Sequence, residues 1–350
     1  MKIAVLVSGG VDSSVALHLL KNQGHDVEAF YLKIWLENEM SFLGECPWEE
    51  DLSYVEQVCK QCDVRLNIVP LQKEYYERVV DYTIDAVKNG LTPNPDMLCN
   101  REIKFGAFYD KYGKNFDKIA TGHYAQIKEL KNGEVKLMRA PDSVKDQTYF
   151  LAMMSQQQLQ KAMFPIGYMQ KSEVRQYAQD NKLATAKRKD SQGICFLGEI
   201  SFVDFVKEHL GVRKGKFIEK ETGDELGKHD GFYFYTIGQR RGIDINGGPW
   251  YVCDKDVAKN IIYLTHGYTG DDQRRDQFDV KNVNWIGDNP VKKELQVKLR
   301  HGESFHDCTI DIVGACEAHV TLSAKDPGIT PGQYAVFYDG KYCLGGGVIT

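Results

Sequence analysis

The stretch at residues 91–100, LTPNPDMLCN, places an aspartate and a cysteine on a backbone that contains two prolines. Proline fixes φ, removes a backbone donor and disfavours helix at the preceding residue, so Thr92 to Pro95 should form a stiff, extended turn. Cys99 could act as a nucleophile, and Asp96 could act nearby as a general acid or base. The alternative is structural, because the same residues suit a helix start with Asp96 as its cap and Cys99 as a small buried side chain.

A second candidate nucleophile is Cys195, in the stretch KDSQGICFLGE at residues 189–199. It lies between Gly193 and Gly198 and follows the basic run 187–189. Nearby positive charge stabilises a thiolate and lowers the pKa of the thiol, which makes the sulfur nucleophilic. Cys195 therefore has the surroundings of a reactive cysteine.

The other cysteines carry weaker signals. The chain has nine, an odd number without framework spacing, which indicates free thiols in a reducing compartment and only transient disulfides. Cys253, Cys308 and Cys343 lie in apolar, strand-like stretches and are assigned to packing. Cys59 and Cys62 form a C-x-x-C, but no second half of a zinc site accompanies them, so no metal site is predicted.

The segment Ser8-Gly9-Gly10-Val11-Asp12-Ser13-Ser14 has the composition of a phosphate-binding loop. Adjacent glycines let backbone N–H groups approach a ligand, and the following helix presents free N–H donors and the positive end of its dipole. A plain glycine turn with a capped helix would explain part of this string. The loop lacks the lysine of a Walker motif and should therefore bind a pyrophosphate leaving group, without transfer of a γ-phosphoryl group.

Apolar runs at 2–7, 27–35, 65–70 and 118–122 alternate with helical patterns such as 12–22 and 73–88. Strands that alternate with helices predict a parallel sheet of the α/β class, whose ligands bind at the carboxyl ends of the strands. Gly122 ends the fourth run, where its lack of a side chain would let the backbone meet a nucleotide. His123, the next residue, could contact phosphate or base, or could have a structural role only.

The remainder of the chain changes character. After about residue 205 it is rich in glycine, aromatic and β-branched residues, and short alternating strands follow from about 278, with a hairpin signal at Asp339-Gly340. We expect an α/β domain at 1–205, a small β-rich linking domain at 206–274 and a β-barrel at 275–350.

Composition limits the class of protein. With 350 residues, 42% hydrophobic residues and a net charge of −5, the chain is long enough for two or three domains and does not bind nucleic acid by bulk charge. No apolar run approaches the roughly 20 residues of a membrane span, and the N-terminus does not have the pattern of a signal peptide. We expect a cytoplasmic protein, which acts as a monomer.

The loop LVSGGVDSS is similar to the PP-loop of ATP pyrophosphatases. Further stretches, in order TPNPDMLCNREIKFG, ATGHYA, KDQTYFL, KRKDSQGICFLGE, TIGQRRG, WYVCDKD and TPGQYAVFYDG, resemble the tRNA-specific 2-thiouridylase family over essentially the whole chain. The resemblance implies a PP-loop (adenine nucleotide alpha hydrolase-like) domain, a small central domain and a C-terminal barrel that contacts tRNA. It also implies adenylation of the 2-oxygen of a tRNA wobble uridine, followed by sulfur transfer that releases AMP.

The resemblance implies a set of site residues. Those expected to bind ATP, with Mg²⁺ on the nucleotide and no tightly bound prosthetic group, are Leu6, Val7, Ser8, Gly9, Gly10, Val11, Asp12, Ser13, Leu32 and Gly122. Those expected to contact tRNA are Asn94, Pro95, Asp96, His123, Lys145, Asp146, Gln147, Arg300, His301 and Gln333. The family often carries Arg followed by Tyr where this chain has Arg300-His301.

The resemblance also gives roles to the two cysteines. Cys195 would carry a persulfide, Cys99 would be its partner nucleophile, and Asp96 would assist as acid or base. Turnover would end in a transient Cys99–Cys195 disulfide. The partners implied are tRNA, a persulfide-donating sulfur carrier or cysteine desulfurase, and a cellular thiol reductant.

Two other functions are alternatives for such a sequence. A PP-loop ligase or amidotransferase using an amine would need neither the cysteine pair nor a C-terminal barrel. A catalytically silent RNA-binding protein would not need an intact PP-loop with two candidate thiols.

Overall fold

A computed structural model describes residues 1–34, 48–189, 201–266, 275–326 and 328–350. The first part of the chain forms a parallel sheet with the strand order β3-β2-β1-β4-β7. Its strands are β1 (Lys2–Val7), β2 (Asp26–Lys33), β3 (Leu66–Pro70), β4 (Lys118–Ala120) and β7 (Ala162–Met163). The chain moves outward from β1 to β3 and then returns to the other side of β1, so the carboxyl ends of β1 and β4 meet at a switch point.

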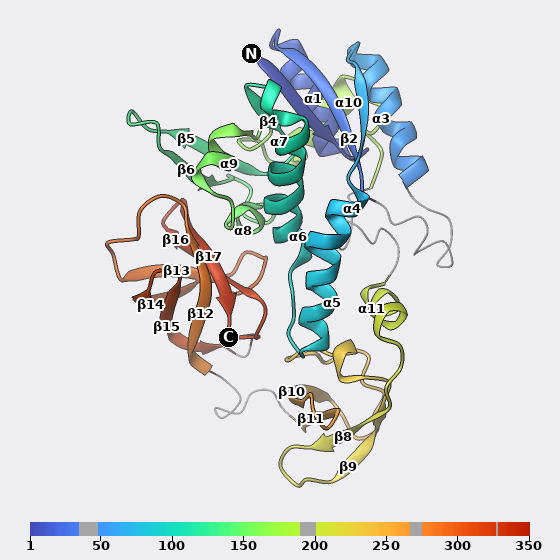
Figure 1. The fold of residues 1–350 in the computed structure, drawn as a ribbon, viewed down its shortest axis with the longest axis vertical. Helices are drawn as coiled ribbons and strands as arrows, with labels where there is room; N and C mark the ends of the chain where they lie inside the picture. Colours follow the sequence, from blue (N-terminus) through green and yellow to red (C-terminus); the bar gives the residue numbers. More distant parts are fainter. Residues whose placement is uncertain (35–47, 190–200, 267–274, 327) are drawn as a thin grey trace.

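Helices cover this sheet and extend beyond it (Figure 1). In chain order they are α1 (Val11–Asn22), α3 (Trp48–Cys62), α4 (Gln72–Tyr75), α5 (Asp81–Lys88), α6 (Pro95–Leu98), α7 (Phe108–Lys111), α8 (Thr148–Leu151), α9 (Gln156–Lys161), α10 (Lys171–Asp180) and α11 (Phe202–Leu210). Two π-helical segments, η2 (Tyr76–Val80) and η3 (Cys99–Ala107), continue α4 into α5 and α6 into α7. Figure 1 shows the stretch from α4 to α5 running from the sheet toward the central domain.

The central domain is a four-stranded sheet in the order β10-β11-β8-β9. Its strands are β8 (Gly215–Glu219), β9 (Glu225–His229), β10 (Trp250–Asp256) and β11 (Ile261–His266). Within this sheet β10 pairs with β11 in the antiparallel direction.

The last part of the chain is a barrel in which β12 pairs with both β15 and β17. Its strands are β12 (Arg275–Trp285), β13 (Glu294–Lys298), β14 (His306–Gly314), β15 (Glu317–Asp326), β16 (Tyr334–Asp339) and β17 (Tyr342–Ile349). Closure leaves these strands without an open edge, and the turn at Asp339-Gly340 joins β16 to β17 as expected.

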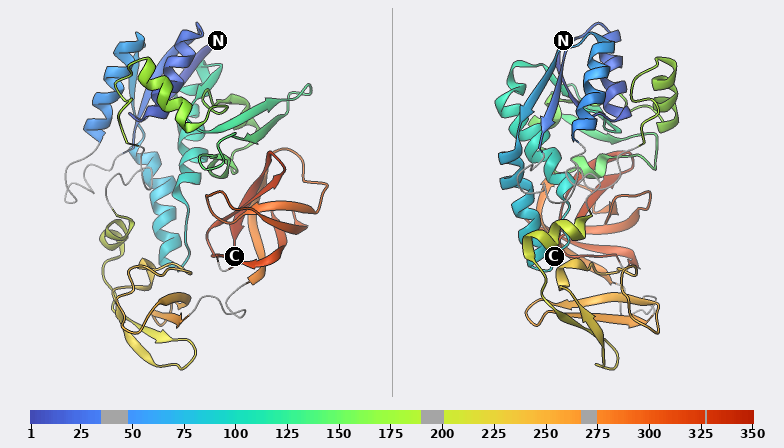
Figure 2. Two further views of the ribbon diagram at one scale, coloured as in Figure 1. Left: turned by 180° about the vertical axis from the view of Figure 1, so that it is seen from behind. Right: turned by 90° about the vertical axis from the view of Figure 1, so that its right-hand side faces the viewer.

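The barrel is not separate from the first domain. A hairpin of the first domain, β5 (Ala125–Glu129) and β6 (Val135–Arg139), adds to it, because β6 pairs with β17 at Tyr342 and Cys343. The two views in Figure 2 show the barrel beside this hairpin, with the central domain at the far end of the molecule. The sequence did not predict this junction.

The expected class, an α/β domain with a parallel sheet followed by β-rich parts and a barrel, is confirmed. None of the helices in the described ranges is both long enough and apolar enough to span a membrane.

Candidate active site

The PP-loop connects β1 to α1 and is held by its own side chains. The Ser13 and Ser14 hydroxyls donate to the Gly10 carbonyl over 3.2 and 2.9 Å, and the Ser8 N–H donates to Ser13 Oγ over 3.2 Å. Gly9 has a φ of +76°, which favours glycine, and Gly10 is the N-cap of α1 without a side-chain cap. The first turn of α1 therefore presents backbone donors, which is the arrangement that binds an anion.

The end of β4 lies against this turn. A Cβ on Gly122 would lie 2.6 Å from Ser13 N and 2.7 Å from the Asp12 carbonyl carbon, so only glycine fits there. The neighbouring positions of β1 and β4 thus bring Gly122 to the PP-loop, and its contact with ATP stays a prediction.

Asp12 of the loop is paired with a lysine from a distant helix. Lys171 Nζ, at the start of α10, lies 2.6 and 2.8 Å from the two Asp12 carboxylate oxygens, and the Tyr124 hydroxyl donates to the same carboxylate over 2.8 Å. The sequence showed that the loop has no lysine of its own. The fold places a cation beside it from a position 159 residues away, for which no local pattern gave a signal.

A second cation contacts the loop from the other side. Arg188 Nη1 donates to the Gly9 carbonyl over 2.8 Å, and its guanidinium pairs with Asp51 and lies over the ring of Tyr54. Sequence reasoning assigned the basic run 187–189 to the thiolate of Cys195. The structure shows that Arg188 contacts the PP-loop, so the run also serves the phosphate-binding side of the site.

His123 follows Gly122 but is enclosed. Its side chain packs edge-on against Phe164, and its Nδ1 lies 2.6 Å from Thr121 Oγ1. Burial, and then the nearby charge of Lys104, hold the pKa of His123 well below its ordinary value, so the imidazole is neutral. The contact with tRNA expected for His123 stays a prediction.

The stretch with the two prolines forms a helix start, which is the structural alternative given above. The residue that caps this helix is Asn94, whereas the sequence suggested Asp96. Asn94 is the N-cap of α6, its side chain accepts from Met97 N over 3.4 Å, and Pro95 occupies the first turn, a favoured place for proline. The alternative role of Asp96 as the cap is therefore wrong, and Asp96 lies one residue further into that turn. The contacts with tRNA predicted for Asn94, Pro95 and Asp96 stay predictions.

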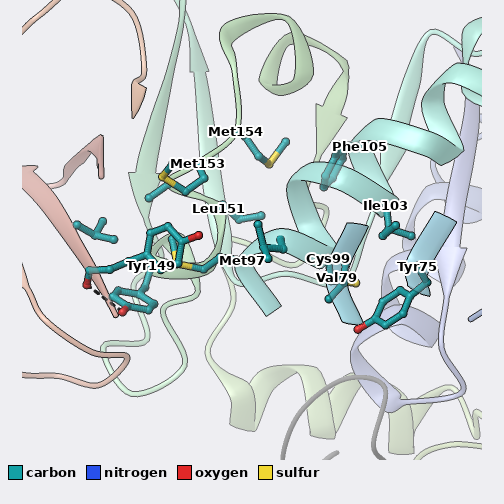
Figure 3. Close-up of a cluster of buried hydrophobic side chains, with 14 of the residues drawn as sticks. Tyr75, Val79, Met97, Cys99, Ile103, Phe105, Tyr149, Leu151, Met153 and Met154 are labelled. Carbon is teal, nitrogen blue, oxygen red and sulfur yellow. Dashed lines mark hydrogen bonds between the residues drawn. The ribbon is translucent and has the colours of Figure 1, made fainter. Parts of the chain in front are cut away.

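Cys99 lies where α6 becomes the π-helical segment η3. Its residue is 1% exposed, and Figure 3 shows it with Tyr75, Val79 and Ile103 in the largest hydrophobic cluster. π-Helical turns are uncommon and occur frequently at functional sites. A reaction at this thiol would require the cluster to open. Cys195 lies outside the described residues.

Of the triplet Lys145-Asp146-Gln147, Asp146 is the most enclosed. Its carboxylate accepts from Thr148 Oγ1 at 3.0 Å and from the buried Lys298 of the barrel at 3.4 Å. Gln147 Oε1 accepts from the backbone N–H of Tyr124 at 3.0 Å. The side chains of Asp146 and Gln147 therefore make hydrogen bonds within the protein. The tRNA contacts expected for the triplet stay predictions.

The barrel residues differ in accessibility. The Arg300 side chain is 61% exposed, and its Nη2 lies 3.9 Å from a carboxylate oxygen of Asp326, so its contact with tRNA stays a prediction. His301 stacks on Phe150 with 4.7 Å between ring centroids, and its Nε2 lies 3.3 Å from the Asp146 carbonyl. Burial lowers the pKa of His301. Gln333 lies in the turn before β16, where its N–H donates to Thr330 O.

The remaining predicted residues add little chemistry. Leu6 and Val7 are buried at the end of β1, and Leu32 packs against the main cluster from the end of β2. Cys59 and Cys62 are buried on α3, where burial raises the pKa of their thiols to about 12 and about 11. Among the described residues, no group of three or more His, Cys, Asp or Glu side chains could hold a metal ion.

Three family models match successive parts of the chain. They are described as a tRNA methyl transferase HUP domain at residues 1–199, a tRNA methyl transferase PRC-barrel domain at 203–266 and an aminomethyltransferase β-barrel domain at 275–349. Among solved structures, one titled as a 4-thiouridine synthetase–RNA complex with bound ATP has a TM-score of 0.34 and 17% identity, covering 60% of this chain and 50% of that one.

Full-length relatives are much more similar. The tRNA-specific 2-thiouridylase MnmA of Parabacteroides distasonis is 49% identical over 100% of this chain and 99% of its own length. The tRNA-specific 2-thiouridylase MnmA 1 of Bacteroides thetaiotaomicron is 46% identical over 100% of both chains. With identity of this order along its whole length, the chain belongs to the tRNA-specific 2-thiouridylase family.

Proposed function

We propose that this chain is an ATP-dependent sulfurtransferase that converts the wobble uridine of tRNA to 2-thiouridine. Two observations support this proposal. The serines of the PP-loop hydrogen-bond its backbone, and Lys171 and Arg188 contact the loop. The whole chain also aligns with 2-thiouridylases. The names of the relatives state that they act on tRNA and place sulfur at position 2 of uridine. The phosphate-binding loop supports activation of that base by ATP.

The PP-loop would bind the phosphates of ATP. Backbone donors from Gly10 onward would face the pyrophosphate, and Lys171 and Arg188 supply positive charge next to a loop that has no lysine. Mg²⁺ would enter with the nucleotide and neutralise phosphate charge. The uracil 2-oxygen attacks the α-phosphorus, pyrophosphate leaves, and the C2–O bond is thereby activated.

Sulfur would come from a persulfide on Cys195, supplied by a sulfur carrier or a cysteine desulfurase. The outer sulfur forms a bond to C2, AMP leaves with the former uracil oxygen, and the Cys99 sulfur forms a bond to Cys195 Sγ as the S–S bond of the persulfide breaks. Two electrons pass to the transferred sulfur, so the cysteines finish as a disulfide, which a cellular thiol must reduce. Asp96 would accept the proton of the Cys99 thiol.

A turnover experiment without reductant tests the roles of the cysteines. Protein is mixed with tRNA, ATP, Mg²⁺ and an excess of a persulfide-charged sulfur carrier, without added thiol reductant, and tryptic peptides are mapped by mass spectrometry. We expect about one equivalent of 2-thiouridine per enzyme and a Cys99–Cys195 peptide in preference to other pairings, because the oxidised pair is inert until reduced.

Two variants serve as controls for the experiment. Cys195→Ser should release pyrophosphate but form no 2-thiouridine, whereas Cys308→Ser, at a buried barrel position, should behave as the unmodified protein does. Sustained turnover without reductant, or normal thiolation by Cys195→Ser, would show that the cysteine roles are wrong. The nucleoside mass also separates exchange of oxygen for sulfur from the addition of a methyl group.

A further inference from the structure

The 89–94 segment, which joins α5 to α6, is contacted by the central domain. Lys255 Nζ of β10 donates to the Gly90 carbonyl over 3.3 Å, where α5 has just ended. A Cβ on Gly90 would lie 2.5 Å from Val257 Cγ2, so the central domain fits closely against this point. One side of the segment is therefore fixed by a domain that carries none of the predicted site residues.

The barrel contacts the same segment from another side. The Thr92 N–H donates to the Pro331 carbonyl over 2.9 Å, in the turn that precedes β16. The next residue, Gly332, has a φ of +91°, and a Cβ there would lie 2.7 Å from Thr92 N and 2.8 Å from Leu91 Cβ. Gly332 is thus the residue at which the barrel backbone meets the backbone of the 89–94 segment.

A third contact lies at Asn94. Asn94 Oδ1 caps α6, and its side chain lies near the Tyr149 hydroxyl, which donates to the Tyr334 carbonyl over 3.1 Å. Tyr334 is the first residue of β16, two residues after Gly332. The cap of the helix that carries Cys99 is therefore linked to the same edge of the barrel.

The path from Thr92 to Cys99 is short and stiff. Pro93 and Pro95 have a fixed φ, and α6 is a single turn that ends at Cys99. A displacement of Thr92 will therefore move Cys99, because few backbone torsions between them can absorb it. An ordinary Cβ contact is at least 3.4 Å, so a methyl group at 332 must push the barrel turn and the 89–94 segment apart by about 0.7 Å.

We propose that Gly332 is a positioning residue for Cys99: the barrel turn, by meeting Thr92 without a side chain, sets where the reacting thiol lies. This inference rests on the proposed function, in which Cys99 takes part in sulfur transfer. Gln333, the neighbouring residue, is one of the predicted tRNA contacts, so the turn that would meet tRNA also contacts the segment that leads to Cys99.

The test compares Gly332→Ala with Gly340→Ala. Gly340 lies in the same barrel and also has a positive φ, of +57°, but a Cβ there meets no atom within 4 Å. The two variants share backbone strain and differ in the contact with Thr92. At saturating tRNA and ATP, we expect Gly332→Ala to release pyrophosphate at the normal rate and to lose 2-thiouridine formation by on the order of 10- to 100-fold. Gly340→Ala should keep both rates.

A second measurement does not depend on the proposed function. Without tRNA and ATP, alkylation of Cys99 by iodoacetamide, read by peptide mass spectrometry, should be faster in Gly332→Ala than in Gly340→Ala, because displacement opens the packing around the thiol. Equal alkylation rates, equal losses of pyrophosphate release and thiolation, or normal thiolation by Gly332→Ala would each overturn the proposal. If the unmodified protein forms no 2-thiouridine, the proposed function fails, and the alkylation rates still decide whether Gly332 positions Cys99.

Discussion

Two neighbouring glycines of the PP-loop have different constraints. A Cβ on Gly9 would lie 2.7 Å from both Arg188 Nη1 and the Asp51 carbonyl, whereas the nearest atom to a Cβ on Gly10 is Ser8 Oγ at 3.7 Å. Gly9 is therefore needed by the fold, and Gly10 leaves space on the side where the phosphates would approach.

The first prediction follows from this difference. Gly10→Val should keep an unfolding midpoint close to that of the unmodified protein and abolish tRNA-dependent pyrophosphate release, because its side chain takes the space for phosphate. Gly9→Ala should lower the unfolding midpoint, since it is strained at positive φ and displaces Arg188. Normal pyrophosphate release by a folded Gly10→Val would refute the assignment of the loop.

The buried His123 predicts a loss of stability in acid. Its pKa is lowered in the folded protein, so below the ordinary value of 6.5 the unfolded chain binds more protons, and stability falls as pH falls. At pH 5.5, one pH unit below that value, this residue should cost about 1.4 kcal/mol. Urea unfolding at pH 7.5 and at pH 5.5 measures this effect. The free energy of unfolding should fall less from pH 7.5 to pH 5.5 in His123→Gln than in the unmodified protein. An equal fall in both would show that His123 is not held neutral in the folded protein.

Some residues of the site were predictable from the sequence and others were not. Ser8 to Ser14 and Gly122 lie in short motifs at strand ends, and the strand order brings them together. Lys171 and Arg188 contact the loop from far along the chain, and a lone lysine or a basic run has no local pattern that names its partner.

At the scale of elements, α6 has a cap that can be tested. Asn94→Ala removes the hydrogen bond to Met97 N and should lower the free energy of unfolding by about 1 kcal/mol, whereas Asn94→Asp, which also caps helices well, should cost much less. Chemical denaturation measures both. If the Asn94 amide also hydrogen-bonds the base, Asn94→Asp will keep its stability and still lose thiolation. If the Asn94→Asp variant thiolates tRNA normally, Asn94 acts only as a helix cap.

The regular elements were predictable where their pattern was strong. The four apolar runs became β1 to β4, and the pattern at 73–88 became the stretch from α4 to α5. The two-residue strand β7 is too short for a periodic signal, and the π-helical segment at Cys99 has the same polar and apolar pattern as an α-helix. The junction of β6 with β17 was missed because the two strands lie some 200 residues apart, although the β5–β6 hairpin itself has a local turn signal at Asn132-Gly133.

At the scale of the whole molecule, a buried ion pair joins the barrel to the first domain. Lys298 and Asp146 have fully buried side chains, and Arg139 lies 3.7 Å from the same carboxylate. Lys298→Met should lower the free energy of unfolding by about 3 kcal/mol, because it leaves a buried carboxylate with weaker compensation. The double variant with Asp146→Asn should recover part of this loss in denaturant unfolding. A double variant no more stable than Lys298→Met alone would contradict the coupling.

ATP-dependent 2-thiolation of tRNA by this protein can be measured by nucleoside analysis. The protein is incubated with tRNA, Mg²⁺ and a sulfide or persulfide source, with and without ATP, and the tRNA is digested and analysed by mass spectrometry. We expect 2-thiouridine at the wobble position only when ATP is present, with AMP and pyrophosphate formed alongside, and none with Gly10→Val. Unchanged wobble uridine in the presence of ATP, or 2-thiouridine formed equally without ATP, would show that the protein is not an ATP-dependent 2-thiouridylase.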